Sequence, residues 1–165
     1  MEILNKDSYY SAEANQEYLS ASQYSDFMEC EHMAMAKIRG EYNPPPDTAL
    51  LAGSLLHSWN DGTMEQFKKE HPEMFSSKGP TKGELKSEYQ IINRMIEALE
   101  ADPFCMMALE GEKEAIMTSE MFGAMWKIRM DVYNPERRFV VDLKSTRSIN
   151  ELVWSNERWA KVSFI

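Results

Sequence analysis

The chain has 165 residues, which is the usual size of one domain. Hydrophobic residues make up 43% and charged residues 27%, so the composition excludes wholesale disorder. No apolar run approaches the ~18 residues needed to span a bilayer, and the N-terminal residues lack the features of a signal peptide. The two cysteines are far apart and form no disulfide framework, which favours a reducing, cytoplasmic setting.

The net charge of −9 argues against a generally basic nucleic-acid coat protein. The charge is uneven, because residues 1–112 carry 9 Lys and Arg against 20 Asp and Glu, whereas residues 113–165 carry 9 against 7. A surface that handles phosphate groups is therefore expected in the last third of the chain. The equally good alternative is a set of helices with solvated acidic faces.

Helical signals fill the first two thirds of the chain, after a loose arm expected over residues 1–18. Most of the expected helices begin at residues whose side chains can cap the first turn, and glycine or proline ends several of them. A single domain is expected over residues 19–165. The expected helices run from Ser20 to about Arg39, from Thr48 to Asn60, from Thr63 to before Pro72, from Thr81 to about Ala101, and from Asp102-Pro103 to near Gly111.

The last third of the chain is rich in β-branched, aromatic and Met residues, which favour strands. Three strands are expected at residues 115–118, 124–133 and 139–143, followed by a helix from Ser148 to about Trp159. The fold class is therefore α/β in α+β order, with N-terminal helices, an antiparallel β-meander and a C-terminal helix.

The expected hairpin carries residues that could bind a metal ion and take part in catalysis. Alternation along the strand places Asp142 and Lys144 on one face. Folding the hairpin brings Asp131 opposite Asp142 or one step diagonal from it, so that the two carboxylates can share one cation. Mg²⁺ or Mn²⁺ prefers such oxygen ligands, and the lysine can orient a water or stabilise charge during phosphodiester hydrolysis. The alternative is an exposed hairpin on which Asp142 and Lys144 form a minor ion pair.

Three arginines flank the expected hairpin site, and they either contact DNA phosphates or solubilise a turn. They are Arg137, Arg138 and Arg147.

The segment Asp142-Leu143-Lys144, together with Asp131, resembles the PD-(D/E)XK nuclease superfamily. Its continuation Ser145-Thr146 is similar to the ending of the RecB-like branch, and residues 19–30 are similar to the opening helix of that branch. The order of the motifs most resembles phage and prophage exonucleases of the RecE, exodeoxyribonuclease VIII-like type. The resemblance implies a restriction-endonuclease-like core and a Mg²⁺- or Mn²⁺-dependent exonuclease that acts on linear double-stranded DNA.

The resemblance also implies roles for individual residues. Asp131, Asp142 and the Leu143 main-chain carbonyl would bind the cation. Lys144 would position or activate the attacking water. The segment Gly53 to His57 is similar to a G-x-x-x-H helix whose histidine is a metal ligand. Glu114 would be a supporting acid, with Glu112 as the alternative two residues earlier.

One part of the family pattern is missing. RecB-like nucleases continue into a helix that carries Gln-x-x-x-Tyr, which does not occur after Ser148. We therefore expect a C-terminally incomplete domain with an uncovered sheet edge and inefficient cleavage. The resemblance implies a phage or prophage setting in a bacterial host, a single-strand annealing protein as partner, and homo-oligomers. The alternatives are a non-catalytic remnant or DNA-end-binding module and, more remotely, an acidic adaptor that binds no metal.

Overall fold

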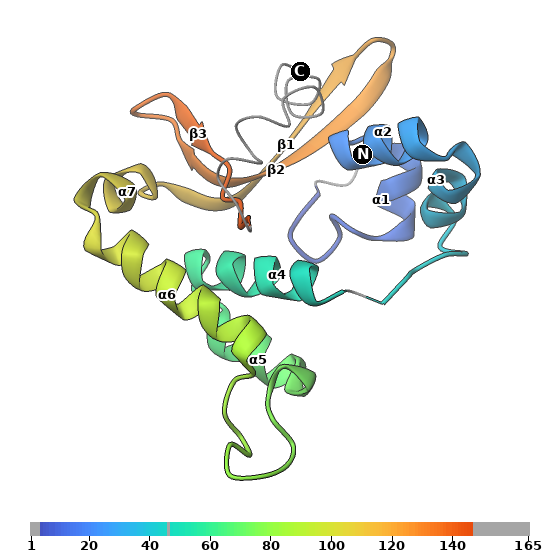
Figure 1. Cartoon of the computed structure of the whole chain (residues 1–165). Helices are drawn as coiled ribbons and strands as arrows, with labels where there is room; N and C mark the ends of the chain where they lie inside the picture. The colour runs from blue at the N-terminus through green and yellow to red at the C-terminus, as the bar shows by residue number, and fades with distance from the viewer. Residues whose placement is uncertain (1–3, 46, 147–165) are drawn as a thin grey trace. The chain divides into compact units, whose positions relative to one another are not determined.

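The computed structural model describes residues 4–45 and 47–146. Helices come first and a three-stranded sheet follows, which confirms the predicted α+β order (Figure 1). The elements are α1 (Ala12–Glu17), α2 (Ala21–Glu29), α3 (Glu31–Ile38), α4 (Thr48–Asn60), α5 (Met64–Glu70), the 3₁₀ helix η1 (Pro72–Met74), α6 (Ser87–Ala101), α7 (Pro103–Ala108), β1 (Glu112–Met121), β2 (Ala124–Asn134) and β3 (Phe139–Val141). The predicted helix over 148–159 lies outside the described residues.

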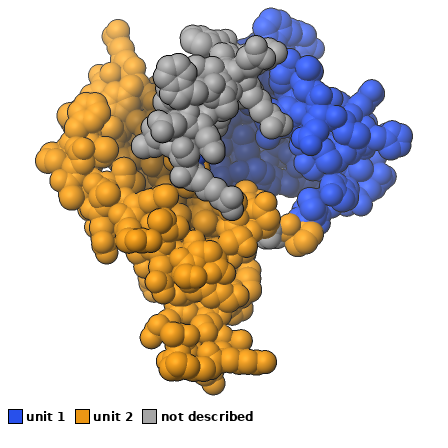
Figure 2. Space-filling model, viewed as in Figure 1, with its two compact units in different colours: residues 1–44, 116–129, 146–165 blue, residues 45–115, 130–145 orange. Residues whose placement is uncertain are grey.

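The chain divides into two compact units (Figure 2). Unit 1 contains residues 1–44, 116–129 and 146–165, and unit 2 contains residues 45–115 and 130–145. β1 and β2 each contribute residues to both units. Within the described residues, no helix combines the length and the apolar character that crossing a membrane requires.

Side-chain caps set two helix starts where the sequence predicted them. The Asp47 carboxylate accepts a hydrogen bond from the Leu50 N–H at 2.7 Å and begins α4. Asp102 accepts from the N–H groups of Phe104 and Cys105 at 2.8 and 3.3 Å and begins α7. These caps form locally because each satisfies N–H groups that have no partner within the helix.

The predicted single helix from Ser20 to Arg39 is wrong, because the chain breaks at Cys30. Ser20 caps the start as expected, and its hydroxyl oxygen accepts from the Gln23 N–H at 3.3 Å. Cys30 is extended, with φ −159° and ψ 107°, and separates α2 from α3. An ion pair of 2.7 Å between Lys37 Nζ and Asp26 Oδ1 joins the two helices. This long-range contact has no signature in the local sequence.

Two further expectations are also wrong. The predicted loose arm contains helix α1, and Tyr9, Ala14 and Tyr18 within it are all buried. The predicted helix start at Thr81 is displaced, because α6 begins at Ser87. Residues 81–86 instead form turns and an antiparallel bridge between Leu85 and Phe75.

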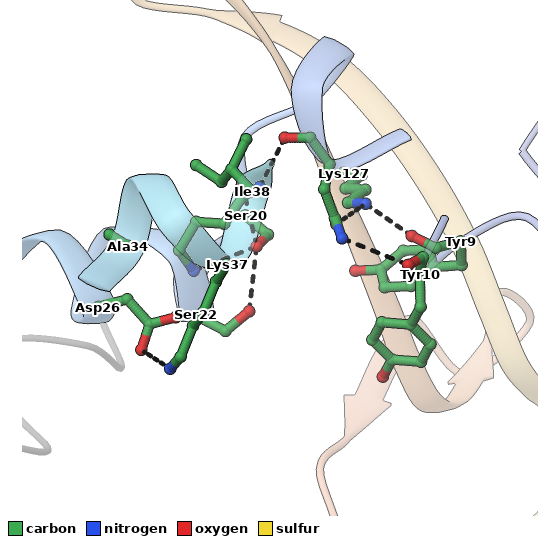
Figure 3. Close-up of a pocket in the computed structure, with 11 residues that line it drawn as sticks. Tyr9, Tyr10, Ser20, Ser22, Asp26, Ala34, Lys37, Ile38 and Lys127 are labelled. Atoms are coloured by element: carbon green, nitrogen blue, oxygen red, sulfur yellow. Dashed lines mark hydrogen bonds and ion pairs between the residues drawn. The ribbon is translucent and has the colours of Figure 1, made fainter. Parts of the chain in front are cut away.

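Unit 1 contains a pocket of about 160 Å³ that is lined by both polar and apolar side chains (Figure 3). Lys127 lines it with only 4% of its surface exposed. The Lys127 ammonium donates to the Tyr9 carbonyl at 2.6 Å and to Asn15 Oδ1 at 2.7 Å, and it lies 4.7 Å from the Tyr9 ring centre. Burial lowers the pKa of Lys127. The lysine therefore ties the N-terminal segment to β2 within this unit.

The core of unit 2 lies between α4 and α6. Leu55 of α4 and Ile92 of α6 are almost completely buried, because apolar residues recur at helical spacing along both helices, and Met74 of η1 is buried with them. Complete burial of each such side chain contributes about 1.5–3 kcal/mol. Leu143 packs on this core from the segment after β3. That contact anchors the backbone between Asp142 and Lys144.

The sheet has the order β1-β2-β3. β2 and β3 pair antiparallel, with Val132 opposite Val141 and Asn134 opposite Phe139. β1 and β2 are joined by the two-residue turn Phe122-Gly123, whose φ values of 55° and 74° match a type I′ hairpin turn. The predicted order of three strands is confirmed, although β1 starts three residues earlier than expected and β3 ends two residues earlier.

Candidate metal centre

Three elements of unit 2 bring three donor side chains together: His57 from α4, Glu114 from β1 and Asp131 from β2. One ligand atom of each residue lies within 4.8 Å of the others. Glu114 is 4% exposed and Asp131 is 8% exposed. Carboxylates so deeply buried are costly unless they are paired or hold a cation. We refer to these three residues as the donor cluster.

Asp131 is fixed by hydrogen bonds on both carboxylate oxygens. Its Oδ2 accepts from the Leu143 N–H at 2.6 Å, and its Oδ1 lies 3.2 Å from His57 Nδ1. Burial alone would raise the pKa of Asp131, but the hydrogen bonds to His57 and Leu143 outweigh it and lower that pKa. The hydrogen bond to Asp131 raises the pKa of His57, while burial and the nearby Lys144 charge oppose the rise. The pair therefore favours charged Asp131 and protonated His57 in the absence of a cation.

The backbone at Glu114 departs from the regular strand. Its φ of 57° lies in the left-handed region, which costs about 1 kcal/mol or more for a residue other than glycine. Glu114 and Ala115 are both buried although they are neighbours, whereas Glu112 is exposed. Such a departure from alternation re-aims a side chain, as a β-bulge does. Glu114 lies in the donor cluster, whereas Glu112, which simple alternation places on the same face, is exposed and does not.

Asp142 and Lys144 lie outside the donor cluster. Their side chains form an ion pair of 2.8 Å and are 59% and 45% exposed. The register that pairs Val132 with Val141 would next bring Asp131 opposite Asp142, as the hairpin count predicted. However, β3 ends at Val141, and the Asp131 carboxylate binds the Leu143 N–H.

The three flanking arginines have different environments. Arg137 is held by Glu110 at 2.8 Å and by the Met107 carbonyl at 3.2 Å. Arg138 is exposed in the turn, with a φ of 55°. Arg147 lies outside the described residues.

Two polar residues beside the cluster escaped the sequence analysis. Asn60 donates to the Asp131 carbonyl at 3.2 Å, and Lys113 donates to Asn60 Oδ1 at 2.7 Å. A signal for Asn60 was present, because it lies three residues after His57 and so near the same helix face. Lys113 had no comparable signal, since the Asn60 side chain that it contacts lies 53 residues away in the chain.

The donor cluster fits a divalent cation. It offers an imidazole nitrogen and two carboxylates, and their close approach is expensive without a cation between them. Carboxylate oxygens suit Mg²⁺ and Mn²⁺ in particular. The residues present therefore suit a divalent cation.

A helix histidine, two strand carboxylates and an adjacent D-x-K segment define an arrangement of the PD-(D/E)XK type. The family model described as "PDDEXK-like domain of unknown function (DUF3799)" matches residues 20–165, and the chain belongs to this family. The predicted membership of the PD-(D/E)XK superfamily is thereby confirmed.

One solved structure is similar, a protein from Eubacterium rectale described as a "Putative exonuclease". The sequences are 42% identical, the TM-score is 0.76, and the match covers 82% of this chain. The chain spans about half the length of that protein, with 52% of it covered. No curated protein matches the chain significantly.

The opposite pKa shifts of the His57–Asp131 pair predict how the metal-free protein responds to pH. The raised pKa of His57 makes a contribution to the free energy of unfolding. This contribution is complete below pH 6.5 and is lost as the pH rises through the folded-state pKa of His57. The lowered pKa of Asp131 also contributes to the free energy of unfolding. This contribution is complete above pH 3.8 and is lost as the pH falls through the folded-state pKa of Asp131. With EDTA present, the pair is therefore expected to stabilise the protein more at about pH 6 than at about pH 8.

Thermal unfolding of the wild type and of His57→Gln across this range measures the effect. The difference in Tm between them should shrink as pH rises. A difference that stays constant with pH would contradict the charged pair.

Proposed function

We propose that this chain is a metal-dependent deoxyribonuclease, an exonuclease of phage recombination that hydrolyses phosphodiester bonds at the ends of linear double-stranded DNA. The proposal rests on the donor cluster, which lies in unit 2 together with the Asp142–Lys144 ion pair. Family membership and the similarity to a "Putative exonuclease" support it. We place the protein in the cytoplasm of a bacterial host.

The proposed cofactor is Mg²⁺ or Mn²⁺. His57, Glu114 and Asp131 would dominate its affinity, with Asp142 and the Leu143 carbonyl as weaker, additional ligands. When bound, the cation would offset charge on the phosphoryl oxygens and make a bound water more acidic. The hydrogen bond from the Leu143 N–H holds the Asp131 carboxylate in place before any cation binds.

The Lys144 ammonium is the proposed group that orients the attacking water and stabilises charge that develops on phosphate. Its ion pair with Asp142 restricts the position of the ammonium, and its exposure leaves it accessible to a DNA strand. The packing of Leu143 on the core keeps this short segment from moving away from the strand. Glu114 and Asp131 stay buried, while His57 is partly exposed.

The acidic chain can still bind DNA through a local basic surface that reads only the phosphate backbone. Of the two flanking arginines that the structure describes, Arg138 is the better candidate, because it is exposed and Arg137 is held by Glu110. Arg138→Gln is expected to weaken DNA binding and to reduce the slope of log K against log salt by about 1. Titration of a fluorescent duplex at several salt concentrations measures both.

Arg137→Gln provides the comparison for Arg138→Gln. It should lower thermal stability, because it removes contacts to Glu110 and Met107. An unchanged salt slope in Arg138→Gln would exclude that side chain from the DNA interface.

The decisive experiment is degradation of linear double-stranded DNA with Mg²⁺ or Mn²⁺. Asp142→Ala and Lys144→Ala are expected to abolish it, and Glu136→Ala, an exposed change in the same hairpin turn, should retain it. Metal binding without cleavage in the wild type would instead favour a non-catalytic DNA-end-binding module. Absence of both metal binding and cleavage would refute the proposed chemistry.

The proposed biological setting follows the resemblance to RecE-type exonucleases. A single-strand annealing protein would take up the strand that the exonuclease exposes. Homo-oligomers would keep the enzyme on its substrate. Co-purification with an annealing protein from the same genetic neighbourhood and light scattering of the purified chain test these two parts separately.

A further inference from the structure

We infer that Asn60 and Lys113 are positioning residues that hold Asp131 in register with the other members of the donor cluster; this inference rests on the proposed function. Asn60 ends α4 and is 9% exposed. Its Nδ2 donates to the Asp131 main-chain carbonyl at 3.2 Å. Its Oδ1 accepts from Lys113 Nζ at 2.7 Å, and the same ammonium also donates to the Leu109 carbonyl.

The chemistry of the partners fixes the orientation of the Asn60 amide. A lysine ammonium has only donors, and a main-chain carbonyl is only an acceptor. A reversed amide would set donor against donor at Lys113 and acceptor against acceptor at Asp131. Lys113 therefore determines which way Asn60 points, and Asn60 in turn holds the backbone of Asp131.

The network reaches the segment that carries each member of the donor cluster. Asn60 lies three residues after His57 on α4, and Lys113 directly precedes Glu114 on β1. The third contact is on the backbone of Asp131 itself. A single connected set of hydrogen bonds thus spans the helix and the two strands from which the ligands project.

The hydrogen bond from Asn60 to Asp131 is buried and the one from Lys113 to Asn60 is partly buried, so losing either leaves polar groups without water to replace the partner. Burial lowers the pKa of Lys113, so placing its charge there is costly unless its donors are used. The contacts of its ammonium are to Asn60 and to the Leu109 carbonyl, so its effect on the donor cluster is exerted through the orientation of Asn60.

The most informative variant is Asn60→Asp, because it separates the two halves of the network. It keeps an acceptor for Lys113 and strengthens that contact to an ion pair, but it loses the donor to the Asp131 carbonyl. The carboxylate also sets acceptor against acceptor at the Asp131 carbonyl, so thermal stability should fall, although the stronger contact to Lys113 offsets part of that loss. Mn²⁺ affinity, measured by calorimetry, should fall by about 10- to 100-fold, as is typical when a partner behind a metal ligand is lost.

A second measurement requires neither metal nor DNA. The Leu143 N–H binds the Asp131 carboxylate at 2.6 Å, so hydrogen exchange of that amide reports where the carboxylate lies. Exchange in Asn60→Asp should be faster than in the wild type, with other core amides unchanged. Lys113→Met should give a smaller change in the same direction, because Asn60 remains but its amide is no longer oriented.

Asn134→Ala is the matched control. Asn134 is also an asparagine in unit 2 whose amide donates to a main-chain carbonyl, that of Glu110 at 2.9 Å. It is the last residue of β2, three residues after Asp131, and this hydrogen bond leaves the Asp131 carbonyl untouched. It should leave both the Leu143 exchange rate and the Mn²⁺ affinity unchanged.

The outcomes separate this inference from the proposed function. Unchanged Leu143 exchange in both Asn60→Asp and Lys113→Met would overturn the positioning role, as would equal effects in Asn134→Ala. A wild type that binds no Mn²⁺ would refute the proposed metal chemistry, while the exchange rates would still decide the positioning role.

Discussion

Asp131→Asn is expected to lower Mn²⁺ affinity and DNA cleavage by on the order of 100-fold or more. Loss of a partner behind a metal ligand costs about 10- to 100-fold, so loss of a ligand's charge should cost at least as much. The amide also cannot accept from both His57 and the Leu143 N–H, which share the two oxygens of the carboxylate. Calorimetric titration with Mn²⁺, followed by a DNA degradation assay, measures the two losses.

Asp142→Asn is the informative comparison for Asp131→Asn. Asp142 lies outside the donor cluster and pairs with Lys144, so this variant should lose cleavage but retain most of the Mn²⁺ affinity. Equal loss of Mn²⁺ affinity in the two variants would show that both carboxylates hold the cation equally. That result would support the cation site shared by Asp131 and Asp142 that the sequence alone suggested.

Gly111→Ala is expected to have the largest effect on stability. Gly111 has a φ of +148°, and an added Cβ would lie 2.5 Å from the Tyr133 carbonyl oxygen and 3.0 Å from its carbon. Both are main-chain atoms, so relief requires movement of the segment that leads into β1. The combined steric and conformational cost should be about 3 kcal/mol or more.

Chemical denaturation of Gly111→Ala beside Gly83→Ala measures this cost. Gly83 also has a positive φ, of +86°, but an added Cβ would meet nothing within 4 Å. It should therefore lose only about 1 kcal/mol from backbone strain. A loss in Gly111→Ala no larger than that of the control would show that β1 and β2 can separate there at little cost.

The parts of the fold that the sequence predicted are those determined by neighbours in the chain. The caps Asp47 and Asp102 bind N–H groups two or three residues away, so their motifs predict their structure. The strand order follows from turn residues and from runs of β-forming residues. The break at Cys30 differs, because it carries no glycine or proline to mark it.

In the candidate site too, the sequence predicted what nearby residues and motifs determine and missed what distant contacts determine. The hairpin count brought Asp131 near the end of β3, and the family pattern pointed to His57 and Glu114. Simple alternation gave Glu112 and Glu114 the same face and could not reveal the left-handed backbone at Glu114. Asn60 and Lys113 were missed because the hydrogen bonds that join them to each other and to Asp131 span 53 or more residues of the chain.

The left-handed backbone at Glu114 has a consequence for protein engineering. Glycine or asparagine would occupy that conformation at lower energy, so replacing the glutamate should relieve strain and remove a buried charge. A laboratory selection for heat resistance alone would therefore tend to discard Glu114. Screens that couple survival to catalysis would retain it, and the contrast would reveal a trade-off between stability and activity at this position.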